Sequence, residues 1–135
     1  MTSNYLPLTL HGQHIKDLSF ENPNSHKLPK LKEAPKIELD VKSEYLDLKK
    51  DMHELNLKTK VNASIEDKIL FILELQYAGF FECKIKDDSE KKRFIVTGSS
   101  LLFPFARSLI SNITMEGGFK PLILQPINFE TLFKE

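Results

Sequence analysis

Apolar and polar residues alternate along four stretches of this chain, which is the pattern of strands with one buried face. The stretches are residues 13–21, 36–42, 54–63 and 68–81. The links at residues 47–51 and 64–67 are short enough for hairpins, so we expect an antiparallel sheet. One face of this sheet is polar and suits solvent, whereas the other is apolar and needs helices to cover it.

Two apolar residues break the pattern of the last strand. Strict alternation puts Leu70 and Ile72 on the face that otherwise carries Lys68, Glu74 and Gln76. They either lie under a loop or form a small docking patch with acidic neighbours. In the first strand, the same alternation predicts that Leu18 and Phe20 point inward, on the same side as His14 and Lys16.

A strongly apolar helix is predicted for residues 100–113, with Ser99 or Ser100 as its cap and Gly117–Gly118 as its end. Leu102, Ala106, Leu109 and Ile113 form its main buried stripe. Because further apolar residues lie off that stripe, we expect a second copy of the protein to cover them. The predicted interface residues are Leu102, Phe103, Phe105, Ala106, Leu109, Ile110 and Ile113.

The remaining segments complete the predicted organisation. We expect residues 1–12 to be a flexible N-terminus and residues 13–135 to form a single domain. Residues 87–93 are predicted to be a solvated loop, and residues 94–96 either a strand or the lead-in to the helix. Asn128 is expected to cap a short terminal helix that reaches Phe133. The fold class is therefore α+β, with a four-stranded antiparallel sheet covered on one face by a long helix and a short C-terminal helix.

The composition excludes several function classes. Basic and acidic residues number 19 each, so no overall field attracts nucleic acid or an anionic membrane. No run approaches the roughly 18 apolar residues of a membrane span, and the N-terminus lacks the regions of a signal peptide. The single cysteine, Cys83, suits a reducing compartment. We therefore expect a soluble cytoplasmic protein without direct membrane insertion.

No enzyme motif is found in the sequence, and no catalytic residue, cofactor or metal is expected. His11 and His14 are spaced like possible ligands of one metal ion, but two histidines alone are a weak signal. His26 and His53 are expected to be solvated, and Cys83 to be packed or idle. The unusual features of the chain are apolar instead.

Four segments resemble the SecB family of bacterial protein-export chaperones, in the family's order. They are Ile15–Asn24, Phe71–Phe81, Leu102–Arg107 and Gly118–Leu122, the last continuing to Pro126–Phe129. The resemblance implies a homotetramer built as a dimer of dimers. It also implies ATP-independent holding of unfolded precursor proteins and their delivery to the translocation ATPase SecA.

The resemblance also implies roles for particular residues. The positions that match the family's SecA-binding surface are Asp17, Glu21, Ile72 and Glu74. Those that match its client-binding groove include Ile37, Leu39, Val41 and Phe133. Two departures leave the strength of SecA binding open, since the chain is electrically balanced where the family is commonly acidic, and it stops soon after Phe133.

Two alternatives remain open from the sequence. One is a SecB-like chaperone dedicated to a single client, such as the antitoxin of a toxin–antitoxin system. The other is a small-ligand-binding α+β domain that uses the apolar groove. The client repertoire and affinities are not determined by these patterns.

Overall fold

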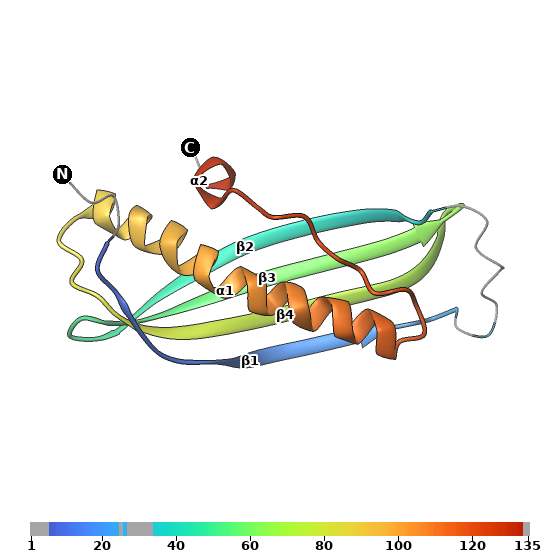
Figure 1. Cartoon of the computed structure of the whole chain (residues 1–135), viewed down its shortest axis with the longest axis horizontal. Helices are drawn as coiled ribbons and strands as arrows, with labels where there is room; N and C mark the ends of the chain where they lie inside the picture. Colours follow the sequence, from blue (N-terminus) through green and yellow to red (C-terminus); the bar gives the residue numbers. More distant parts are fainter. Residues whose placement is uncertain (1–5, 25, 27–33, 134–135) are drawn as a thin grey trace.

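One antiparallel sheet carries the whole architecture of the chain. The computed structural model describes residues 6–24, 26 and 34–133. In chain order the elements are β1 (Thr9–Glu21), β2 (Lys36–Lys49), β3 (Met52–Ile65), β4 (Lys68–Glu82), α1 (Asp88–Glu116) and α2 (Phe129–Leu132). The strand order is β1-β4-β3-β2, and both helices lie on the same side of the sheet (Figure 1). The predicted fold class is confirmed.

The two predicted hairpins are present. The turn between β3 and β4 consists of Glu66 and Asp67, whose φ angles of 49° and 65° both lie in the left-handed region. Two such residues in succession match the right-handed twist of the strands that they join. Asp51, with φ of 60°, has the same conformation in the β2–β3 turn.

The core lies between the apolar face of the sheet and α1. Leucines of β3 and β4 are fully buried there, as are Phe94, Leu102 and Ile110 of α1. The fully buried leucines of the strands are Leu55, Leu57, Leu73 and Leu75. Close packing extends to Gly98, where an added Cβ would lie 2.6 Å from Leu55. Because β3 and β4 occupy the centre of the sheet, the apolar residues of the edge strands β1 and β2 are covered less completely.

The helix begins much earlier than predicted. Its N-cap is Asp87, whose side chain accepts a hydrogen bond of 2.8 Å from the backbone N–H of Glu90. The Glu90 carboxylate in turn accepts one from the N–H of Lys86. Residues 87–93 are therefore the cap and first turns of α1, not a loop. Their charged side chains face solvent, so no apolar period revealed the helix, and Pro104 is accommodated within it.

Two bulges change which side chains face the core. On β1 the pairing with β4 shifts between Ile15 and Asp17, so Lys16 and Asp17 both occupy the open face. Leu18 and Phe20 therefore face the helix side, opposite to Lys16, which corrects the predicted alternation. On β4 a shift beside Leu70 turns that residue into the core, where it is 2% exposed. A strict period of two cannot anticipate such insertions.

The ends of the chain differ in part from prediction. Leu6 is buried and β1 begins at Thr9, so this part of the expected flexible N-terminus is folded; residues 1–5 lie outside the described residues. After α1, the backbone N–H of Leu122 donates to the Thr114 hydroxyl at 2.9 Å. The C-terminal segment then buries Leu124 and Phe129 as it returns along the helix side of the sheet (Figure 1). Asn128 caps α2 as predicted.

Helix α1 is strongly apolar over part of its length, although it contains no unbroken run of about 18 apolar residues. An 18-residue window of this helix has a mean hydropathy of 1.4, which is enough to cross a membrane by length and composition. Within the structure, 39% of that window is buried. The apolar content is thus explained at least in part by packing against the sheet.

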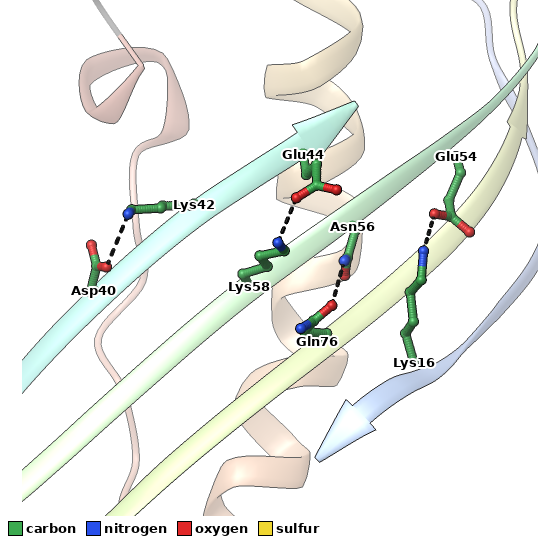
Figure 2. Close-up of polar contacts among 8 residues, drawn as sticks. All are labelled: Lys16, Asp40, Lys42, Glu44, Glu54, Asn56, Lys58 and Gln76. Atoms are coloured by element: carbon green, nitrogen blue, oxygen red, sulfur yellow. Dashed lines mark hydrogen bonds and ion pairs between the residues drawn. The ribbon is translucent and has the colours of Figure 1, made fainter. Parts of the chain in front are cut away.

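Lys16 and Glu54 form a partly buried ion pair on the open face, with 2.6 Å between Nζ and Oε2 (Figure 2). The Glu54 side chain is only 10% exposed, whereas both partners of the Lys36–Glu38 pair are well exposed. We predict that Lys16→Met lowers the free energy of unfolding by about 1–2 kcal/mol, because it leaves the Glu54 carboxylate buried without its donor. The control Lys36→Met should change it by less than about 0.5 kcal/mol. Urea denaturation at one protein concentration measures both, and equal effects would contradict the assignment.

Candidate functional site

The open face of the sheet is a network of paired charges. Glu44 and Lys58 lie 2.5 Å apart, and this hydrogen bond with Lys58 lowers the pKa of the Glu44 carboxyl below its ordinary value. Asn56 donates to Gln76 at 2.8 Å across β3 and β4. Figure 2 shows these contacts running across the strands, together with the Asp40–Lys42 pair. Most of the charged side chains on this face are therefore paired with an opposite charge on the same face.

The four residues matched to the SecA-binding surface lie together on this open face, and we refer to Asp17, Glu21, Ile72 and Glu74 as the docking patch. In the β1–β4 register, Glu21 stands opposite Ile72, and Ser19 opposite Glu74. Asp17 stands opposite Gln76 and belongs to the same face, since it alternates regularly with Ser19 and Glu21. Ile72 is half-buried between the acidic side chains. The patch thus joins an apolar contact to carboxylates, and its binding role stays a prediction.

Three of the residues matched to the client groove share one face of the edge strand. Ile37, Leu39 and Val41 pair with core-facing residues of β3, so they point to the helix side of the sheet; we call them the β2 strip. Leu39 is 41% exposed and the other two are half-buried. Phe133 instead follows α2 and packs on Phe129, with 5.6 Å between ring centroids. The strip is therefore a partly uncovered apolar surface.

The predicted oligomer residues fall into two groups. Leu102, Phe103, Ala106 and Ile110 are buried against the protomer's own core, at 4% exposure or less. They are unavailable to a second copy, which corrects their assignment as contact residues. Phe105 is 47% exposed, and Leu109 and Ile113 are half-buried. The error arises because a helical stripe does not reveal which of its two apolar sides the sheet occupies.

An apolar hollow at the β1 edge was not predicted from the sequence. It has a volume of about 350 Å³ and is lined by His14, Ile15, Tyr77, Phe105, Ser108 and Leu109. Ile15 is 44% exposed although it faces the helix side of the sheet. The apolar residues of β1 could have indicated this hollow. An edge strand has a neighbour on one side only, so beside a strongly apolar helix some apolar side chains of both the strand and the helix stay uncovered.

Three of the four histidines have identifiable partners, whereas His26 is exposed. His11 pairs with Glu82 at 2.8 Å, and His14 stacks on Phe80. His53 is buried rather than solvated, since its ring bonds the Tyr45 hydroxyl at 2.7 Å and the Cys83 carbonyl at 2.9 Å. Over residues 6–24, 26 and 34–133, no group of three or more His, Cys, Asp or Glu residues is placed to hold a metal ion.

Two further hollows of about 400 Å³ lie at the surface near the start of α1. One is next to α2 and includes Lys92, Arg93 and Glu130. The other is beside the β2–β3 hairpin and includes Asp47 and Lys91. Their mainly charged and polar walls differ from the apolar linings typical of small-molecule sites.

The fold and these surfaces define a class of binding protein that presents partly uncovered apolar strips and a mixed acidic and apolar patch. A family model described as "Preprotein translocase subunit SecB" matches residues 2–135. The chain belongs to the SecB family, whose members are protein-export chaperones.

Curated relatives agree with this membership. The chain is 35% identical to the protein-export protein SecB of Wolbachia sp. subsp. Drosophila simulans (strain wRi), with 95% of this chain and 88% of that protein covered. It is 38% identical to that of Rhodospirillum centenum, over 98% of this chain and 80% of that protein. It is 39% identical to that of Hyphomonas neptunium, over 91% of this chain and 74% of that protein.

A solved structure has the same fold. It is a SecB-like chaperone of Mycobacterium tuberculosis in complex with a ChAD peptide from the HigA1 antitoxin. The TM-score is 0.75 with 14% sequence identity, covering 89% of this chain and 90% of that one. At this identity the likeness supports the fold alone.

Cys83 is 3% exposed, and burial raises the pKa of its thiol above the ordinary value, with smaller contributions from Glu90 and Asp51. A raised pKa lowers the fraction of reactive thiolate at pH 8, and burial also blocks access. We predict that a soluble disulfide reagent reacts with the native protein at least about tenfold more slowly than with the protein in urea. Absorbance of the released thiol measures both rates, and similar rates would show that Cys83 is accessible and reactive.

Proposed function

We propose that this protein is an ATP-independent holding chaperone that binds unfolded precursor proteins in the cytoplasm and delivers them to SecA for export. The observation that carries the proposal is family membership over nearly the whole chain, with relatives at 35–39% identity named for protein export. The exposed apolar strips supply the physical means. The function requires no cofactor, metal, nucleic acid or membrane insertion.

Client binding would use the apolar surfaces on the helix side of the sheet. The β2 strip lies on an edge strand, and Ile123 of the C-terminal segment is 70% exposed. An unfolded chain that covers such residues gains about 25 cal/mol per Å² of apolar area before the costs of binding. Several modest contacts along one flexible client raise its overall affinity without requiring a sequence motif.

The docking patch would receive SecA. Its carboxylates would attract a basic segment, and Ile72 would add an apolar contact at the centre. Since the whole chain has a formal net charge of zero, this attraction would depend on local charges rather than on the field of the entire protein.

A homotetramer built as a dimer of dimers is part of the proposal. The hollow at the β1 edge, with Ile15, Phe105 and Leu109, is continuous with the exposed edge of the sheet. A second copy would remove these side chains from water. We expect a tetramer mass by native mass spectrometry, and Phe105→Asp should shift it to smaller species. A wild-type monomer at micromolar concentration would contradict this part of the proposal.

Two other functions are tested by the same client experiment. Several denatured precursors are diluted into buffer with the protein, and aggregation is followed by light scattering. Suppression for several unrelated precursors supports the general export chaperone. Suppression for a single partner would favour a dedicated chaperone. No suppression, with a stoichiometric small molecule retained by the native protein, would favour a ligand-binding domain.

The β2 strip can be tested by substitution. We predict that Leu39→Ser combined with Val41→Ser reduces suppression of aggregation by at least about threefold, because each serine replaces an apolar contact with a polar group. The matched control is Leu46→Ser, which alters a residue of the same strand that is 49% exposed and stands opposite Glu54 on the open face. Circular dichroism must first show that both variants are folded. A folded double variant with full activity would place the client surface elsewhere.

The docking patch can be tested by charge reversal. We predict that Glu74→Lys weakens binding to SecA about tenfold or more at low ionic strength, because an attraction becomes a repulsion. Asp40→Lys is the control, since it makes the same change of net charge on the same face of β2, two strands away from β4. Isothermal titration calorimetry gives both affinities. Equal losses in the two variants would indicate a general charge effect instead of a local site.

A further inference from the structure

One lysine stands directly beside the docking patch. Lys60 of β3 is opposite Glu74 of β4, and its Nζ lies 3.5 Å from the Glu74 Oε1. On its other side Lys60 faces Asp40 of β2, and Asp40 pairs with Lys42 at 3.8 Å. A single row across the open face therefore contains Ser19, Glu74, Lys60 and Asp40.

The Lys60–Glu74 pair is weak enough to exchange partners. Both side chains are about half exposed, at 50% and 53%. Exposed ion pairs contribute little to stability, because water and salt compete with them. In contrast, Glu54 is bonded to Lys16 at a side-chain exposure of only 10%, so that pair belongs to the fixed part of the face.

A cation next to an acidic docking surface opposes an incoming basic partner in two ways. It occupies one of the carboxylate oxygens that the partner would use. It also repels the partner's own positive charge, and this repulsion is strongest at separations of a few ångströms.

We propose that Lys60 competes with the basic segment of SecA for Glu74 and so limits the strength of docking on this chain. The inference rests on the proposed SecA binding and adds a residue outside the docking patch that sets its affinity. Lys60 acts through Glu74 and is thus a tuning residue, not a contact residue. It would lower the affinity for SecA locally, in a chain whose formal net charge is zero.

The test compares Lys60→Gln with Lys42→Gln, using the full-length protein and purified SecA. Both substitutions remove one positive charge from an exposed residue of the open face, so the change in net charge is the same. We expect Lys60→Gln to bind SecA about three- to fivefold more tightly at 50 mM salt, and Lys42→Gln to remain within about twofold of wild type. The difference between them should largely disappear at 0.5 M salt.

A double-variant cycle separates competition from a structural effect. If Lys60 acts through Glu74, the gain from Lys60→Gln should be lost when Glu74→Gln is also present. Unchanged or weaker binding by Lys60→Gln, or a gain equal to that of Lys42→Gln, would overturn the inference while leaving the proposed function intact. No SecA binding by wild type or by either variant would instead reject the proposed docking, and the inference with it.

Discussion

The structure depends on one packing contact, in which a single long helix covers the apolar face of a four-stranded sheet. The contact is closest over the central strands, where Phe81 packs edge-on against Phe94 with 5.4 Å between ring centroids, and both are fully buried. One helix is too narrow to cover four strands. The edge strands consequently keep apolar side chains that are only half covered, and the surfaces available for partners follow from this limited width.

The two edges are left uncovered in different ways. At the β2 edge, the C-terminal segment passes over the sheet but leaves Leu39 accessible (Figure 1). At the β1 edge, Ile15 and Phe105 line a hollow between the strand and the helix. The opposite face of the sheet bears cross-strand ion pairs instead. The uncovered apolar strips thus lie on the helix side of the sheet, and the ion pairs lie on its open face.

Periodicity predicted the fold well because the central strands obey it. Leu55, Leu57 and Val61 alternate with polar residues and are all buried, as their pattern indicates. The failures occur where one residue is inserted, since the bulges at Lys16 and Leu70 reverse the predicted faces of the residues that precede them in β1 and β4. The start of α1 was missed because its first turns are held by Asp87 and Glu90 rather than by apolar contacts.

The site was predictable only in part for a related reason. The four residues of the docking patch could be chosen from the resemblance to the SecB family, and the strand register brings them onto one face. The nearby Lys60 could not be placed, because its pairing with Glu74 depends on the β3–β4 register. Likewise, the pattern of the helix identified Phe103 and Ile110 as apolar, but only the position of the sheet determines that they face inward.

The C-terminal segment is attached to α1 at two points. Its beginning is held where Leu122 bonds Thr114, and its end is held where Phe129 packs on Phe103 with 5.6 Å between ring centroids. A strap fastened at both ends cannot swing away from the molecule as a free arm would. Between these two anchors Leu124 is also buried in the core, so the segment is held against the sheet along its length and the covering that it gives to the sheet is fixed.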